Sequence, residues 1–135
     1  PVKLVNDFFA FEEGLRNGVF VAVADLDGDG FGDIICGAGP AGAPRVLAFG
    51  GGQLLLGRQS ILFDLYAGGT DERGGVRVAA LDVDEDGRAE VVTGSGPGGR
   101  GQVQVFAAGS LLSGSHVPAL TLQHPDWVGP GVFVG

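Results

Sequence analysis

The sequence predicts an all-β protein made of β-propeller blades, each with four antiparallel strands. We expect about two blades with partial strands at the flanks, as a fragment of a larger propeller. Three observations favour this fold class. The chain repeats itself at an offset of 57 residues, each repeat holds four short stretches rich in Val, Ile, Phe and Leu, and 27 glycines are available for the turns between them. Four strands in about 57 residues is close to the size of one blade.

The repeat is clearest at two acidic stretches, 25–30 and 82–87, which correspond residue by residue. At the same offset the alignment runs without a gap from Asp7 to Gly57, and about twenty positions are identical. A third copy begins near the end, where Gly131–Val134 resembles Gly18–Val21 after one deletion. We therefore expect repeat A at about 8–64, repeat B at about 65–121 and a partial third repeat at about 122–135.

The strands follow from the turns that bound them. In the first repeat a Val/Ala-rich strand ends at the acidic stretch, a second follows it, a third comes after a Gly-rich turn and a fourth closes the unit. These strands are expected over Val19–Ala24, Ile34–Cys36, Arg45–Phe49 and Ser60–Tyr66. In the second repeat they are expected over Val76–Leu81, Val91–Thr93, Gln102–Phe106 and Ala119–Gln123. No stretch has a helical period of useful length, because the run 54–56 is short and bracketed by glycines.

Composition narrows the classes of function. The net charge of −8 disfavours nucleic acid and anionic membrane as partners, since both require a basic patch. No apolar stretch is long enough for membrane insertion. The single cysteine, Cys36, excludes an intrachain disulfide, and we expect it to be a small apolar residue in a strand. The chain begins at Pro1 and contains no Met, so we expect a piece of a longer protein. The missing blades would come from the parent chain or from self-association.

The acidic stretches have the spacing of a calcium loop. Alternate residues of a curled loop point inward, and a glycine at position 6 permits the sharp turn. The expected ligands at positions 1, 3, 5, 7 and 9 are Asp25, Asp27, Asp29, the carbonyl of Phe31 and Asp33. In the second repeat they are Asp82, Asp84, Asp86, the carbonyl of Arg88 and Glu90. So many hard oxygen donors favour calcium over zinc or copper, with about two ions per chain.

Two other interpretations of these loops account for less of the sequence. A plain Asp/Gly hairpin turn would explain one loop, but two in register each carry glycine at position 6. An EF-hand requires glutamate at position 12, where Cys36 and Thr93 stand, and a helix where strand is expected. Carboxylates so closely spaced repel one another, and a divalent ion would remove that repulsion and act as a structural clip between strands.

The stretch 23–40, Val-Ala-Asp-Leu-Asp-Gly-Asp-Gly-Phe-Gly-Asp-Ile-Ile-Cys-Gly-Ala-Gly-Pro, resembles an FG-GAP (VCBS-type) repeat. Such repeats build the propeller of integrin α chains and of many secreted bacterial proteins. The resemblance implies calcium in a hairpin between the first two strands of a blade and an extracellular setting. It covers both repeats. The sequence departs from the family pattern at Glu85, at Glu90 and by an extra glycine in each Gly-Ala-Pro element, which affects the second site more than the fold.

No catalytic constellation is visible. The Gly-rich stretches 37–42 and 94–101 lack the lysine of a phosphate loop, and His116 and His124 are expected on the surface. We expect Trp127 to pack rather than to bind a ligand. The leading hypothesis is therefore a non-enzymatic calcium-binding module for adhesion, recognition or scaffolding, with an unidentified protein or carbohydrate ligand. The alternatives are the propeller part of an extracellular polysaccharide lyase or hydrolase, and a structural array of repeats.

Overall fold

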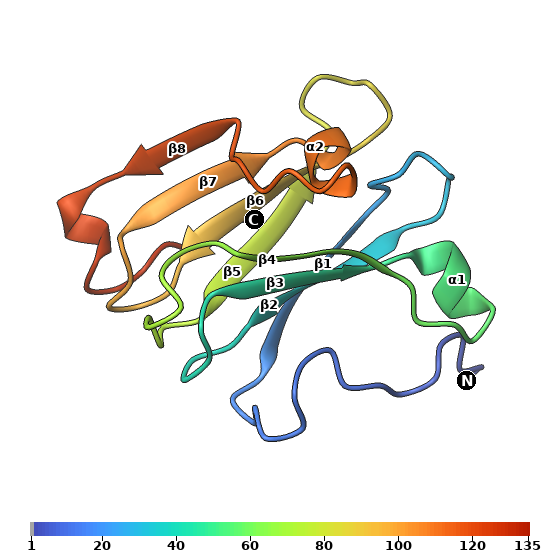
Figure 1. Cartoon of the computed structure of the whole chain (residues 1–135), viewed down its shortest axis with the longest axis horizontal. Helices are drawn as coiled ribbons and strands as arrows, with labels where there is room; N and C mark the ends of the chain where they lie inside the picture. Colours follow the sequence, from blue (N-terminus) through green and yellow to red (C-terminus); the bar gives the residue numbers. More distant parts are fainter. Residues whose placement is uncertain (1) are drawn as a thin grey trace.

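The computed structural model describes residues 2–135. In it, each repeat forms one four-stranded antiparallel sheet (Figure 1). The first sheet has the order β1-β2-β3-β4, with strands Val19–Ala24, Asp33–Ala38, Arg45–Phe49 and Ile61–Tyr66. The second has the order β5-β6-β7-β8, with strands Val76–Leu81, Glu90–Ser95, Gln102–Phe106 and Leu120–Gln123. Each sheet has the strand order of a propeller blade, so the expected fold class is confirmed.

Strand pairing explains where the observed strands differ from the expected ones. β1, β3, β5 and β7 begin and end at the expected residues. β2 and β6 are longer than expected because each pairs along the whole of its neighbour, Ala24 opposite Asp33 and Leu81 opposite Glu90. β4 and β8 each begin one residue later than expected.

One single-turn helix follows the third strand of each blade, and the sequence pattern did not predict either helix. They are α1 (Gly51–Leu55) and α2 (Ala108–Leu112), and a short 3-10 helix, η1, spans Pro125–Trp127. A helix of five residues is too short to show a hydrophobic period. Each instead buries one leucine, Leu54 in α1 and Leu111 in α2, and this packing stabilises the turn.

The main hydrophobic core lies between the two blades. β5 packs against β1 and β2, and α2 packs against β4. Ile35, Ala48 and Phe63 point from the first blade toward Val91 and Phe106 of the second, and all five are buried. The close approach of the blades needs a bare backbone: a Cβ at Gly37 would lie 2.4 Å from the carbonyl oxygen of Val76. The two blades therefore share one core.

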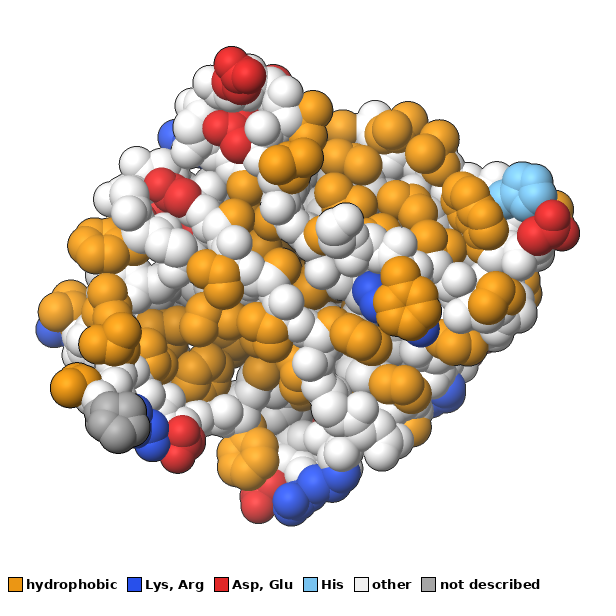
Figure 2. Space-filling model, turned by 180° about the vertical axis from the view of Figure 1, so that it is seen from behind, with side chains coloured by type: hydrophobic (Ala, Val, Ile, Leu, Met, Phe, Trp, Pro, Cys, Tyr) orange, Lys and Arg blue, Asp and Glu red, His pale blue; other side chains and the backbone are white. Residues whose placement is uncertain are grey.

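Terminal segments cover the outward faces. Phe8, Phe11 and Leu15 pack on the first blade over Leu47 and Phe49. At the other end, the segment 131–135 lies on the second blade. Both acidic loops and both helices lie at the same end of the strands (Figure 1). Figure 2, from behind, shows several acidic side chains near the upper left corner and others at the right and lower edges, with hydrophobic side chains over much of the face between them. No helix within residues 2–135 has the length and apolar character needed to cross a bilayer.

Candidate metal centres

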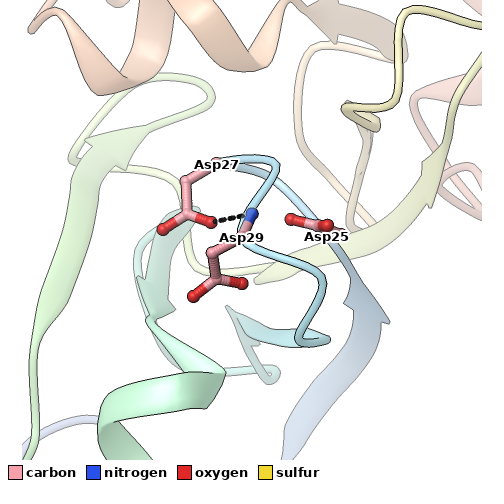
Figure 3. A group of neighbouring side chains, drawn as sticks. All are labelled: Asp25, Asp27 and Asp29. Carbon is pink, nitrogen blue, oxygen red and sulfur yellow. Dashed lines mark hydrogen bonds between the residues drawn. The ribbon is translucent and has the colours of Figure 1, made fainter.

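The loop between β1 and β2 gathers three of the expected ligands. Asp25, Asp27 and Asp29 each place one carboxylate oxygen within 4.8 Å of the others. Figure 3 shows the three side chains converging from one curled segment. The β1–β2 pair anchors both ends of this loop, because the ladder runs up to Ala24 and Asp33. The strand pair therefore closes the base of the loop.

Backbone N–H groups hold these carboxylates in place. Asp25 accepts hydrogen bonds from the N–H groups of Gly28 at 2.7 Å and Gly30 at 2.9 Å. Asp27 accepts from the N–H of Asp29, and Asp29 from the N–H of Phe31. Both glycines have positive φ, 79° and 86°, a region that other residues rarely adopt. The glycines thus curl the loop so that its acidic side chains face one point.

Asp33, the first residue of β2, links the base of the loop to α1. Its side chain is fully buried and accepts from the N–H of Leu26 and from the N–H of Gly51 in α1, each at 2.8 Å. Burial raises the pKa of this carboxyl, the two backbone bonds lower it, and the charges of Asp27 and Asp29 raise it further. Asp33 lies outside the group of three, so its role as a ligand stays a prediction. Sequence reasoning missed its bond to α1, because Gly51 lies 18 residues away and no local pattern joins the two.

The second loop, between β5 and β6, repeats the first. Asp82, Asp84 and Asp86 also bring one carboxylate oxygen each within 4.8 Å of one another. Asp82 accepts from the N–H groups of Asp86 and Gly87, and Asp86 accepts from the N–H of Arg88. The difference is Glu85, which stands where the first loop has Gly28 and keeps a positive φ of 59°. The second loop therefore keeps the conformation of the first, although Glu85, like other residues with a side chain, disfavours a positive φ.

Glu90 replaces Asp33 in the second loop with one fewer anchor. Its carboxylate accepts from the N–H of Val83 at 2.7 Å, which matches the bond between Leu26 and Asp33. The described residues give it no bond to α2 corresponding to the one between Asp33 and α1. Its side chain is half-buried, whereas that of Asp33 is fully buried. The base of the second loop is thus tied to fewer elements than the base of the first.

The two loops also touch each other. The N–H of Ala89 in the second loop donates to the carbonyl of Asp25 at 2.9 Å. The side chain of Arg88 lies beside Gly28, where a Cβ would be 3.5 Å from its Nε. In the first contact the partner in the first loop, Asp25, is itself an expected ligand. In the second contact the partner, Gly28, lies between two expected ligands. Neither contact was predicted from the sequence, because an alignment of the two repeats does not show which residues of adjacent blades come into contact.

Both triplets fit a hard divalent cation. Every side-chain donor is a carboxylate oxygen, and such donors suit calcium. Within residues 2–135, none of the six aspartates has an ion-pair partner that would neutralise it. Three of the six are exposed and the other three are half-buried, which leaves a path for an ion. A bound calcium would supply the missing positive charge; the carbonyls of Phe31 and Arg88 stay predicted ligands.

In the part of the chain that the structure describes, the histidines, the tryptophan and the cysteine lie apart from the two acidic loops. His116 and His124 are exposed, as expected, and Trp127 is half-buried beside the ring of His124. Cys36 is buried in β2, and burial raises the pKa of its thiol to about 11. The neutral thiol therefore behaves as the small apolar residue that the sequence predicted.

Four-stranded blades, each with an acidic loop between its first and second strands, define a repeat protein of the β-propeller class. The FG-GAP repeat family matches residues 17–53 and 74–106, more than half of the chain. The chain belongs to the FG-GAP repeat family, as the sequence motifs indicated. The repeat is a structural propeller module and is not itself catalytic. Comparisons with curated proteins and with solved structures gave no match.

Proposed function

We propose that this chain is a calcium-binding propeller module of a secreted or cell-surface protein, used for adhesion, recognition or scaffolding. One observation carries the proposal: both blades place three carboxylates within 4.8 Å at the same position of the repeat. FG-GAP repeats often bind calcium and are typical of extracellular proteins, where calcium is abundant enough to fill weak sites.

The loops explain what calcium would do in such a module. Three like charges in one loop repel one another, and that repulsion opposes the closed conformation. A cation held by Asp25, Asp27 and Asp29, or by Asp82, Asp84 and Asp86, removes it and fixes the turn between two strands. Since β1 and β5 are also the strands that meet between the blades, each loop stabilises a blade and the contact of that blade with its neighbour.

Calcium titration followed by thermal unfolding tests the proposal. Each site should add about 2.7 kcal/mol to the free energy of unfolding when free calcium is 100-fold above its Kd. Magnesium should do less, because its small octahedral shell fits a flexible carboxylate loop poorly. Asp27→Ala and Asp84→Ala should each remove about one site's share of the rise in Tm.

The control is Asp126→Ala, which removes an exposed carboxylate outside both loops. This variant should keep the full response to calcium, and EDTA should abolish the response in every chain. A Tm that does not change between EDTA and millimolar calcium would contradict the proposal.

A further inference from the structure

One peptide unit connects the two acidic loops. The N–H of Ala89, at position 8 of the second loop, donates to the backbone carbonyl of Asp25, at position 1 of the first, over 2.9 Å. The carbonyl of the same peptide unit belongs to Arg88 and is the expected ligand at position 7 of the second loop. Among residues 2–135 the peptide bonds are trans, and the N–H and C=O of a trans unit point in opposite directions. The unit therefore turns its donor to the first loop and its acceptor away from it.

The hydrogen bond between the loops lies in the core that the two blades share. Ala89 is 4% exposed, and Leu26, which follows Asp25, is fully buried. Both belong to the core cluster between the blades. A buried hydrogen bond is electrostatically stronger than an exposed one, and its loss leaves a buried donor without a partner. The bond therefore constrains both loops.

The side chain of Arg88 makes a second contact with the first loop. A Cβ at Gly28 would lie 3.5 Å from its Nε and 3.8 Å from its Cγ. The N–H of Gly28 in turn donates to the carboxylate of Asp25 at 2.7 Å. The second loop carries Glu85 at the position of Gly28, so the first loop leaves bare the turn that Arg88 covers. Arg88 thus contacts the first loop with its side chain and belongs to the second through its backbone.

These contacts make the closure of each loop depend on the other. Asp86 accepts from the N–H of Arg88 at 2.8 Å, so closure of the second loop fixes the peptide unit that donates to Asp25. Closure of the first loop fixes Asp25 and thereby presents the acceptor. Repulsion among the carboxylates opposes closure in both loops, and a bound cation removes it. A loop that is already closed therefore lowers the cost of closing its neighbour.

We infer that the two loops bind calcium cooperatively, with the peptide unit between Arg88 and Ala89 as the element that couples them. The inference rests on the proposed function, since it takes both loops as calcium sites. Such coupling is reciprocal, so each filled loop raises the affinity of the other by the same factor. The base of the first loop has more anchors, through Asp33, and this loop should fill first. Its filling then eases that of the second loop, where Glu90 has fewer.

Electrostatic repulsion acts in the opposite direction. The carboxylates of one loop also attract a cation to the other, and an ion that neutralises them reduces this attraction. The carboxylates of both triplets are exposed or half-buried, so salt screens this effect, with a Debye length of about 8 Å at 0.15 M. Salt does not screen the buried bond between Ala89 and Asp25 in the same way. Cooperativity should therefore be positive at 0.15 M salt and stronger at higher salt.

A calcium titration followed by NMR measures the two loops separately. The amides of Gly30 and Gly87, at position 6 of each loop, donate to the carboxylates of Asp25 and Asp82 and report the filling of each loop. Asp84→Ala, which removes an expected ligand of the second loop, should raise the Kd reported by Gly30 about two- to five-fold, within what one hydrogen bond contributes.

The reciprocal variant tests linkage. Asp27→Ala should raise the Kd reported by Gly87 by the same factor. The remaining site then adds less to Tm than it does beside a filled neighbour, so each single variant loses slightly more than one site's share in thermal unfolding.

The matched control is Glu85→Gln, which removes a negative charge from the second loop but no expected ligand. Both side chains are of similar length, so the strain of a positive φ is unchanged. At about 1 M salt, where the Debye length is about 3 Å, Glu85→Gln should leave the Kd reported by Gly30 unchanged. Asp84→Ala should still raise it there.

Hydrogen exchange measures the coupling element itself. In Asp27→Ala only the second loop retains all of its expected ligands, and calcium should slow exchange of the Ala89 amide at least a few-fold. The reference is the amide of Gly39, which donates to the carbonyl of Gly18 at the other end of the strands. It reports any general stabilisation of the fold, so Ala89 should slow more than Gly39.

The outcomes separate the inference from the proposed function. If calcium shifts neither Gly30 nor Gly87, the proposed function fails and the inference with it. If both loops bind but each keeps the same Kd when the other is disabled, the cooperativity alone is overturned. Equal effects of Asp84→Ala and Glu85→Gln at about 1 M salt would also overturn it, as would an Ala89 amide that slows no more than that of Gly39.

Discussion

Glu85 has a left-handed backbone conformation, and the equivalent residue of the first loop, which has the same conformation, is Gly28. Its φ of 59° lies in the left-handed region, which costs a side-chain-bearing residue roughly 1–2 kcal/mol. Glycine relieves this strain, but it also gives the unfolded chain more conformational freedom, which lowers the free energy of unfolding by about 0.4–1 kcal/mol. We therefore expect Glu85→Gly to raise the free energy of unfolding by about 0.5–1 kcal/mol, measured by urea titration in EDTA to exclude effects on metal binding.

The matched control is Glu13→Gly, an exposed glutamate without positive φ. It should leave stability unchanged or lower it slightly, since only the gain in unfolded-state freedom applies. Equal effects of the two substitutions would show that the strain at Glu85 is not relieved by glycine.

Arg45 links the first blade to the segment that covers it. Its guanidinium bonds both carboxylate oxygens of Asp64 in β4, at 2.9 and 2.8 Å, and reaches Glu12 at 2.7 Å. The hydrogen bond from Arg45 is the main reason that the pKa of Asp64 is lowered. The carboxylate therefore stabilises the fold fully above its unfolded pKa, and this contribution is lost as pH falls through the lower folded pKa.

We expect Asp64→Asn to reduce stability at pH 7, and we expect the difference from the wild type to shrink as pH falls through the lowered pKa of Asp64 and its carboxylate takes up a proton. The loss at pH 7 should stay below about 1 kcal/mol, because the Asp64 side chain is 41% exposed and water screens the pair. Asp7→Asn is the control at the equivalent repeat position, where the side chain is 95% exposed. A deficit that persists unchanged in acid would contradict the role of the Asp64 charge.

At the scale of elements, repetition made the strands and the acidic loops predictable. Alternating apolar residues bounded by Gly and Asp gave four strands with the right ends, and the Asp spacing identified both triplets that the structure brings together. The helices were missed because one turn leaves no period to detect. The buried bonds of Asp33 to Leu26 and Gly51 were missed because tertiary packing, not local sequence, decides them.

Two glycines at the same repeat position should differ in importance. Gly37→Ala places a Cβ against the Val76 carbonyl, between blades that share a core, and should cost about 1–3 kcal/mol. Gly94→Ala meets the carbonyl of Val132 in the C-terminal segment, which is held by a hydrogen bond from the N–H of Val132 to the carbonyl of Ser95 and not by a shared core. Its cost should be clearly smaller. Thermal unfolding of both variants measures the difference, and equal losses would mean that the C-terminal segment is held as firmly as β5.

At the scale of the whole molecule, the blades do not stand as independent units. The core that joins them draws buried residues from both sheets, α2 of the second blade packs on β4 of the first, and the N–H of Ala89 bonds to Asp25. In repeat proteins the contact between neighbours supplies much of the stability of each unit. Loss of packing in one blade should therefore loosen the other.

Leu111→Ala tests this coupling. Leu111 is 1% exposed in α2 and belongs to the shared core, so its truncation should cost about 2–5 kcal/mol. Because the core is shared, amide hydrogen exchange should speed up in β2 and β3 of the first blade as well as in the second blade. Leu54→Ala, the repeat equivalent in α1, should act mainly on the covering segment near Phe8 and Phe11. Unchanged exchange in β2 and β3 of Leu111→Ala would show that each blade unfolds alone.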